Sequence, residues 1–68
     1  MSTIRVNGAD RALDVATVAE LLASAGVSPG TRGVAVARNG AVVRASDWAA
    51  TALAPGDTIE IIRARQGG

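Results

Sequence analysis

The chain contains no cysteine and no histidine, and Trp48 is its single aromatic residue. Without cysteine, neither a disulfide nor a thiolate metal site can add stability. Without both residue types, the usual general base, the thiol nucleophile and most transition-metal sites are missing. Asp10 and Asp14 lie on a predicted strand, whose period holds them too far apart for an acid–base pair. We therefore expect that the chain is not an enzyme, holds no metal ion and binds no cofactor stably.

Lysine is absent too, so no side-chain amine could accept a self-conjugation. Seven arginines and six acidic residues give a net charge of +1, and no aromatic residues lie between the arginines for base stacking. The N-terminus has no long apolar run, and no stretch approaches the ~20 apolar residues of a membrane span. We expect a cytoplasmic location, a monomer when free, and no binding to nucleic acid or membrane.

What is present is a regular pattern of short elements in one small domain of 68 residues. Residues 3–7 alternate polar and apolar, which is the period of a half-buried strand. Asn7-Gly8 is a hairpin signal, and the return strand is predicted over about residues 9–15 with Leu13 facing inward. A second signal, Asn39-Gly40, lies between predicted strands at residues 34–38 and 41–44.

A short helix is predicted between the two hairpins. Thr17 and Glu20 have the spacing of a capping box, and Gly26 stands where a C-terminal cap belongs. The apolar residues follow at helical spacing: Val18, Leu21, Leu22 and Ala25. A helix of about two turns does not persist alone in water, so it must pack on a sheet with this stripe in the core.

A short helical turn with Ser46 as its cap is predicted over residues 46–50. Trp48 should cover the edge of the core, with its indole N–H bonded to a partner. Leu53 should anchor the following connection, and Pro55-Gly56 is a tight-turn signal.

The last strand is predicted over residues 58–62. Ile59 and Ile61 should face one side of the sheet, and Glu60 and Ile62 the other. We expect Ile62 to lie on the open face with Val43 or its neighbours.

The elements follow the order β-β-α-β-β, with a short helical piece before the final strand. One helix packed on one face of a mixed sheet is the β-grasp, or ubiquitin-like, arrangement, an α+β fold. We expect a β-grasp domain over residues 1–64 and a flexible tail over residues 65–68.

The tail ends in Gly67-Gly68, which has no side chains to block entry into a narrow site. Fully extended, residues 65–68 would reach roughly 13 Å. Because the sequence offers no other candidate reactive group, the carboxylate of Gly68 is the group that we expect to react. Forming an acyl-adenylate with ATP would activate it for capture by sulfur or an amine.

Over nearly its full length the sequence resembles the ThiS-type sulfur carriers of thiamine biosynthesis. The resemblance rests on the order and spacing of several segments: Val6-Asn7-Gly8, Thr17-Val18-Ala19-Glu20-Leu21-Leu22, Val34-Ala35-Val36-Ala37-Arg38-Asn39, Val42-Val43-Arg44 leading to Trp48, Gly56-Asp57-Thr58-Ile59-Glu60-Ile61-Ile62, and Gly67-Gly68.

This resemblance implies that an E1-like enzyme adenylates Gly68 with ATP. Sulfur from a donor such as a cysteine desulfurase would then form a thiocarboxylate, and thiazole synthase would take that sulfur for the thiazole ring. Arg65, Gln66 and Gly67 would enter the partner's active site with Gly68.

Several alternatives stay open on the sequence alone. The chain could carry sulfur for molybdopterin or another pathway, modify other proteins through an amide bond, or be a ubiquitin-like interaction module without a carrier role. Ile62, Arg63 and Val43 are candidates for a partner-docking surface. Related sequences often have an apolar residue where this one has Arg65, so Arg63 and Arg65 either meet an acidic groove or phosphate, or stay solvated.

Overall fold

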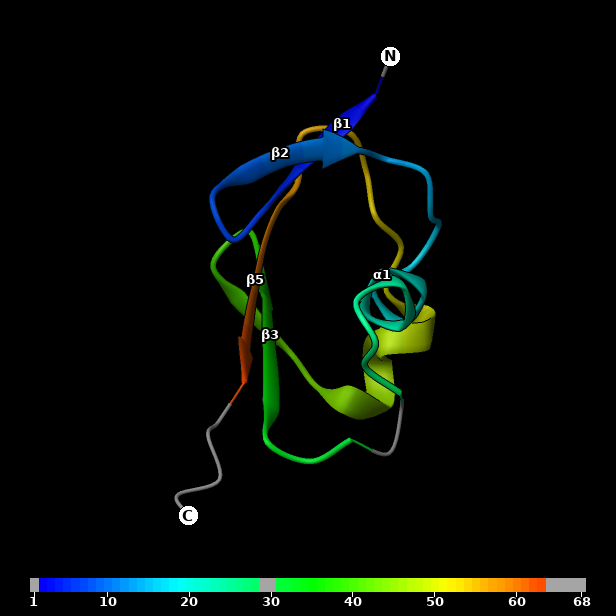
Figure 1. The fold of residues 1–68 in the computed structure, drawn as a ribbon, viewed down its shortest axis with the longest axis vertical. Helices are drawn as coiled ribbons and strands as arrows, with labels where there is room; N and C mark the ends of the chain where they lie inside the picture. The colour runs from blue at the N-terminus through cyan, green and yellow to red at the C-terminus, as the bar shows by residue number, and fades with distance from the viewer. Residues whose placement is uncertain (1, 29–30, 64–68) are drawn as a thin grey trace.

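The computed structural model describes residues 2–28 and 31–63, which form one sheet and a helical layer (Figure 1). The strands are β1 (Thr3–Val6), β2 (Ala9–Ala12), β3 (Val34–Arg38), β4 (Ala41–Val43) and β5 (Thr58–Arg63), and the helices are α1 (Val18–Ser24) and the 3₁₀ helix η1 (Ala45–Ala50).

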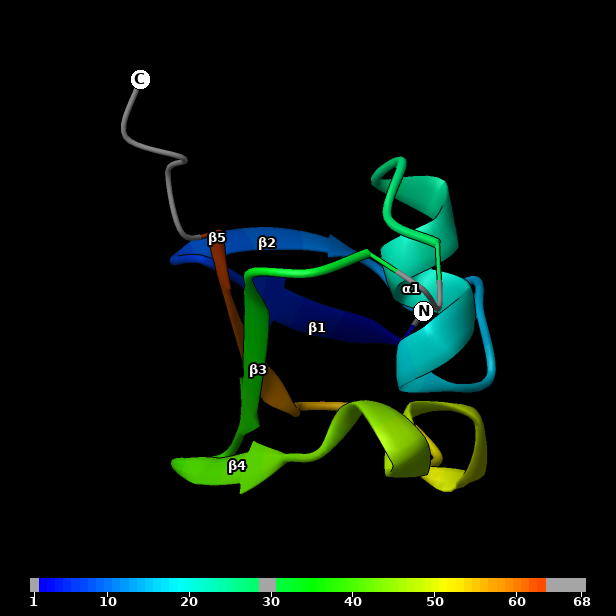
Figure 2. The same ribbon diagram turned by 90° about the horizontal axis from the view of Figure 1, so that it is seen from below.

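The five strands lie in the order β2-β1-β5-β3-β4. β1 and β5 run parallel at the centre, and the other neighbours are antiparallel. Figure 2 shows the sheet as one layer, with α1 and η1 together on one side of it. The α+β, β-grasp prediction is therefore confirmed. The shorthand order β-β-α-β-β is one strand short, because β5 follows η1 as a fifth strand.

Both predicted hairpins are present, and each turns in two residues. Asn7 and Asn39 both have φ of 51°, and the following Gly8 and Gly40 have φ of 83° and 85°. Two successive positive φ values define the type I′ turn, whose twist matches that of the strands it joins. Asparagine tolerates this region and glycine adopts it without strain, so the local sequence specifies both turns.

Helix α1 has both predicted caps. The Thr17 Oγ1 accepts a hydrogen bond from the Glu20 backbone N–H (3.2 Å), and the Glu20 carboxylate accepts one from the Ala16 N–H (2.8 Å). At the other end Gly26 has φ of +84°, and its N–H donates to the Ala23 carbonyl (3.0 Å). The Val27 N–H donates to the Leu22 carbonyl (2.8 Å), which completes a Schellman motif.

The core lies between the sheet and the helical layer. Its buried members are Ile4, Val18, Leu21, Leu22, Val27, Val36, Trp48 and Ile59. Trp48 is the predicted cover of the core edge, and its Nε1 donates to the Val43 carbonyl (3.0 Å). Leu53 packs against the same cluster, and its N–H donates to the Ala16 carbonyl (2.9 Å). The first bond ties η1 to β4, and the second ties the segment after η1 to the connection before α1.

Three local predictions were wrong. β2 ends at Ala12 rather than near residue 15, because Ala12 pairs with Thr3, the first residue of β1. Ser46 does not cap η1, which begins one residue earlier with Arg44 at the N-cap and no side-chain cap bond. Ala25 is exposed and is the C-cap of α1, so the apolar stripe ends at Leu22.

Candidate functional site

β5 is the element that leads toward the predicted reactive end of the chain. It runs from the centre of the sheet and ends at Arg63, the last described residue before the tail. Arg65, Gln66, Gly67 and Gly68 lie outside the described residues, and so does the boundary between domain and tail. The roles assigned to them stay predictions. The described part of the site is the surface from which residue 64 continues.

Asn7 fastens β5 to the turn after β1. Its Oδ1 accepts a hydrogen bond from the Ile61 N–H (2.8 Å), and its Nδ2 donates to the Ile61 carbonyl (3.3 Å). The last backbone bond of the ladder, from the Asn7 N–H to the Ile59 carbonyl (2.9 Å), lies just before these contacts. The Asn7 carboxamide therefore extends the pairing of β5 beyond the end of β1.

Arg63 fastens the end of β5 to the helical layer. Its Nη2 donates to the carbonyl of Ala25, the C-cap residue of α1, at 2.8 Å. A cation at a helix C-terminus meets the negative end of the helix dipole, so charge and hydrogen bond favour the same contact. Asn7 and Arg63 together hold the last three residues of β5 from two directions.

The sheet face turned away from the helices carries an exposed apolar pair. Val42 is 80% exposed and Ile62 is 58% exposed. Ala37 pairs with Val42 and Ala35 pairs with Ile62, so two small side chains lie between them on that face. We call these four residues the open-face patch. Val42 was not among the predicted site residues, although the two-residue hairpin at Asn39-Gly40 fixes its register and could have identified it.

The other two docking candidates lie elsewhere. Val43 pairs with the buried Val36 and packs against the core, so of the expected companions of Ile62, Val43 or its neighbours, it is the neighbour Val42 that lies on the open face. Arg63 follows Ile61 by two residues and reaches α1, which puts it on the helix side of the sheet. Of the three candidates only Ile62 lies on the open face, and docking there stays a prediction.

Asp57, which the sequence did not single out, is a buried carboxylate at the start of β5. It is 6% exposed. Its oxygens accept hydrogen bonds from Arg38 Nε (2.8 Å), Asn39 Nδ2 (3.0 Å) and the Ala54 N–H (2.8 Å). Burial raises the pKa of Asp57, but the bonds from Asn39, Ala54 and Arg38 outweigh it and hold the pKa below its usual value. The group is thus an ionised structural anchor and is not available as a general acid.

No group of three or more His, Cys, Asp or Glu side chains able to hold a metal ion occurs among residues 2–28 and 31–63. A hollow between α1 and η1 is apolar and is lined by Ala19, Leu22, Val27, Ala45, Trp48 and Ala49. In the same described part of the chain, no helix is long and apolar enough to cross a bilayer.

Comparison with known proteins agrees with this architecture. The model of the ThiS family matches residues 4–68. The chain belongs to the ThiS family. A crystal structure of the thiamine biosynthesis protein ThiS from Geobacter metallireducens is similar with a TM-score of 0.76 and 32% identity, over 97% of this chain and 99% of that one. A solution structure of a thiamine biosynthesis protein from Geobacter metallireducens is similar with the same score and identity, over 100% of this chain and 88% of that one. No curated protein sequence matches this chain significantly.

Membership of the ThiS family confirms the resemblance inferred from the sequence. It supports a sulfur carrier, a small protein on which enzymes act, rather than an enzyme. The site consistent with this role is the end of β5, held by Asn7 and Arg63 and flanked by the open-face patch.

Proposed function

We propose that this chain is a sulfur carrier that delivers sulfur for the thiazole ring of thiamine in the cytoplasm. The observation that carries the proposal is the ThiS family match, which continues to Gly68, together with similarity to ThiS over 97% of this chain.

The proposed chemistry takes place at the carboxylate of Gly68. Its oxygen attacks the α-phosphate of ATP in an E1-like adenylating enzyme, which forms an acyl-adenylate and releases pyrophosphate. A persulfide on a donor such as a cysteine desulfurase displaces AMP and forms an acyl disulfide. A second thiol of the partner proteins then attacks the donor's cysteine sulfur, which releases the thiocarboxylate and leaves a disulfide between the two thiols. Thiazole synthase then accepts the sulfur. ATP is bound and consumed by the partner enzyme, and this chain holds no cofactor of its own.

The fold contributes a fixed starting point for the tail. The hydrogen bonds of Asn7 to Ile61 and of Arg63 to Ala25 hold the end of β5 against both layers. A docked partner therefore meets Arg63, the end of β5, at a constant position relative to its own active site. This reduces the conformational entropy that binding must remove from the end of β5.

The open-face patch is the proposed docking surface for these enzymes. Val42 and Ile62 are the large hydrophobic residues that the described surface exposes. Apolar side chains on an otherwise polar surface mark sites of protein association, and flat neighbours such as Ala35 and Ala37 let a partner approach closely.

The decisive experiment is intact mass spectrometry of the full chain after incubation with ATP, a sulfur donor and an E1-like adenylating enzyme of a thiamine pathway. We expect the mass gain of sulfur replacing one oxygen, located on Gly68 by fragmentation. The matched control is the chain without Gly68, which should keep its thermal stability and gain no mass. No gain on the full chain, with an enzyme that releases pyrophosphate on its own carrier, would overturn the proposal.

The pathway that receives the sulfur is tested separately from formation of the thiocarboxylate. The thiocarboxylate form should support thiazole formation by thiazole synthase in stoichiometric amounts. Transfer to a molybdopterin precursor instead would reassign the pathway while leaving the carrier role intact. Amide linkage of Gly68 to lysines of other proteins would identify a protein modifier.

A further inference from the structure

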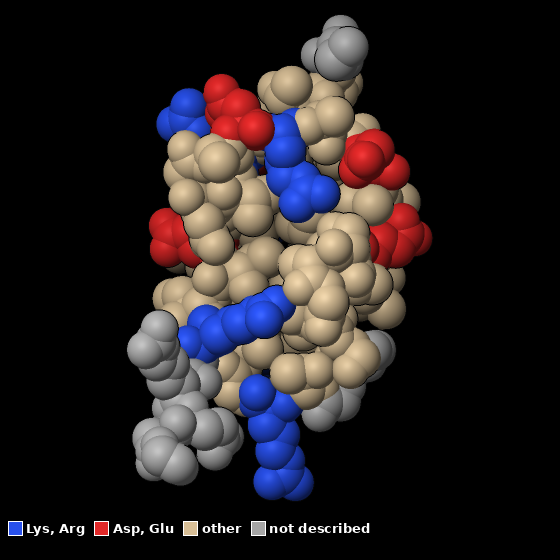
Figure 3. All heavy atoms as spheres, in the orientation of Figure 1, with Lys and Arg blue, Asp and Glu red and all other residues tan. Residues whose placement is uncertain are grey.

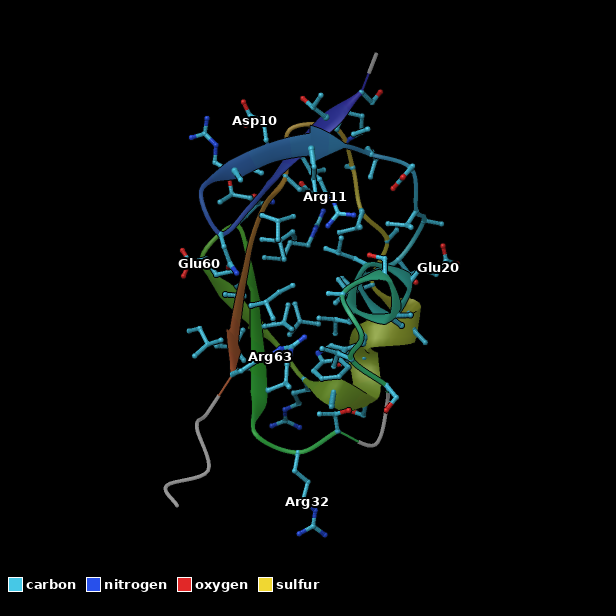
Figure 4. All side chains as sticks on the ribbon, in the orientation of Figure 1. Asp10, Arg11, Glu20, Arg32, Glu60 and Arg63 are labelled. Carbon is cyan, nitrogen blue, oxygen red and sulfur yellow. The ribbon has the colours of Figure 1, made fainter. Side chains whose placement is uncertain are left out.

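Three arginines lie along one face of the molecule. Arg11, Arg63 and Arg32 follow one another down the face shown in Figure 4. In the space-filling view basic side chains lie at the upper left, in the middle and at the lower end of this face, while acidic ones lie at its upper end and along its sides (Figure 3). We call Arg11, Arg63 and Arg32 the basic row. It includes the last residue of β5.

The backbone fixes two members of the basic row on the helix side of the sheet. Arg11 pairs with Ile4, a core residue, so its half-buried side chain extends on that side of β2. Arg63 crosses from β5 to the C-terminus of α1 (Figure 4), where it donates to the Ala25 carbonyl. Long arginine stems can cover apolar surface while the charged heads reach water. Arg11 and Arg63 therefore lie on the helix side of the sheet, whereas Arg32 points away from the body (Figure 4).

The charge of the basic row is not neutralised within the described structure. Residues 2–28 and 31–63 contain two ion pairs, Arg5 with Asp10 and Arg38 with Asp57. Neither pair includes a member of the basic row. The small net charge of +1 is thus compatible with three arginines on one face that form no ion pair in the described structure.

The shape of the basic row favours an extended acidic partner over a small anion. A phosphate site needs donors that converge on one point, whereas Figure 4 shows Arg32 pointing away from the body and Arg63 directed at α1. Single-stranded nucleic acid would need exposed aromatic side chains for stacking, and the only aromatic residue, Trp48, is 3% exposed. A protein surface lined with carboxylates matches the row in both length and charge.

We propose that the basic row docks on an acidic surface of the adenylating enzyme and steers its association with this chain. The inference rests on the proposed function. Arg63 stands five residues before Gly68, so an acidic rim around the entrance of the enzyme would face the row when the tail enters. The row and the open-face patch then have separate roles, the first in the rate of encounter and the second in the lifetime of the complex.

The test compares association rates of full-length variants with one adenylating enzyme shown to charge the wild-type chain. Arg32→Gln and Arg63→Gln remove two charges from the row, singly and together. Arg32 makes no side-chain hydrogen bond in the described structure. Arg32→Gln therefore removes a charge without removing a hydrogen bond of the described fold. The matched control, Ser46→Glu with Ala50→Glu, changes the net charge equally on η1, which follows β4 at the sheet edge opposite β2.

We expect the double arginine variant to associate about tenfold more slowly at ~0.01 M salt, with little change in dissociation rate. The difference from wild type should nearly vanish at about 0.5 M salt because ions screen the interaction. The control should stay within about twofold of wild type under both conditions.

Equal rates for the arginine variants and the control, with normal charging of wild type, would overturn the inference and leave the proposed function standing. Failure of wild type to be charged would overturn both. Binding of a 20-nucleotide RNA, or of vesicles rich in phosphatidylserine, that disappears in the double variant would reassign the row to another partner and overturn the inference.

Discussion

Asp57 shows how a single buried carboxylate joins a turn, a hairpin and a strand. It follows the turn at Pro55-Gly56, where the Asp57 N–H donates to the Ala54 carbonyl (3.1 Å). Its side chain accepts from Arg38 and Asn39 at the far end of β3. A buried acceptor with this many donors is costly to change, because each donor would lose its partner at a carboxylate that is only 6% exposed.

Asp57→Asn is expected to lower the free energy of unfolding by about 2 kcal/mol. The new amide would present donors to Arg38 and Ala54, which are donors themselves, and it would remove the charge. The measurement is urea denaturation near neutral pH. Asp10→Asn is the matched control, since Asp10 pairs with Arg5 through side chains that are 72% and 58% exposed. That change should cost less than about 0.5 kcal/mol, and equal losses for both variants would contradict the account.

The same carboxylate should give a pH dependence of known sign. Its pKa is lowered in the folded chain from an ordinary value of 3.8. Its stabilising effect is therefore complete above that value and is lost as the pH falls through the lower folded pKa. The stability difference between wild type and Asp57→Asn should shrink as the pH falls below about 4, when measured by parallel denaturation series. A gap that stayed constant down to pH 2 would show that ionisation of Asp57 contributes nothing.

At the scale of elements, β5 holds the sheet together and also leads to the tail. It pairs with β1 and β3, and the turns Asn7-Gly8 and Asn39-Gly40 both bond to it through their asparagine side chains. Each asparagine thus has two functions, since it adopts a positive φ and also binds the backbone of β5. A glycine in its place would serve the turn but not the strand.

Asn7→Gly is expected to preserve the hairpin and loosen the end of β5. Glycine adopts the positive φ freely, so the loss reports the two hydrogen bonds to Ile61 and should be about 1–2 kcal/mol. Hydrogen exchange should show faster exchange of the Ile61 amide than in wild type. Asn39→Gly is the matched control, because it makes the same change at the other turn. If Asn39→Gly alone accelerated the Ile61 amide, the proposed anchoring by Asn7 would be wrong.

The sequence predicted the elements whose causes are local. The two Asn-Gly turns, the capping box at Thr17 and the C-cap at Gly26 depend on neighbours within a few residues, and all were found as predicted. The length of β2 depended instead on where β1 begins, because Ala12 pairs with Thr3. That limit is set by pairing across the hairpin, which the turn signal at Asn7-Gly8 does not contain.

The candidate site could be predicted only in part, because some of its features depend on local patterns and others on residues far apart in the sequence. Ile62 was placed correctly by strand alternation from Ile59. Its companion on the open face was expected to be Val43 or a neighbour, and the register across Asn39-Gly40 is what identifies it as Val42. The environment of Asp57 and the grouping of the basic row depend on residues far apart in sequence, and the sequence alone gave no signal for either. The tail itself could be named from the sequence, and the family match extends over it.

At the scale of the whole molecule, different surfaces have different chemistry. The sheet face away from the helices carries the open-face patch, and the face seen in Figure 3 carries the basic row. The end of β5 contributes to both surfaces, since Ile62 belongs to the patch and Arg63 to the row. Alternation along one strand therefore sends successive side chains to two surfaces that border the start of the tail.

This division predicts that docking and folding can be separated by substitutions in adjacent residues. Val42→Thr combined with Ile62→Thr keeps β-branched side chains on exposed positions but removes apolar area, so the fold should be retained. Binding to the adenylating enzyme should weaken roughly tenfold, as measured by calorimetry, because less apolar surface is buried in the complex.

Val43→Thr is the control that tests the face assignment directly. Val43 packs against the core, so threonine there should reduce unfolding stability by about 1 kcal/mol or more and leave the affinity of the folded chain unchanged. The opposite result, with weaker binding from Val43→Thr and none from the exposed pair, would place the docking surface elsewhere. Because the tail is intact in every variant, a change in affinity would report the folded surface rather than Gly68.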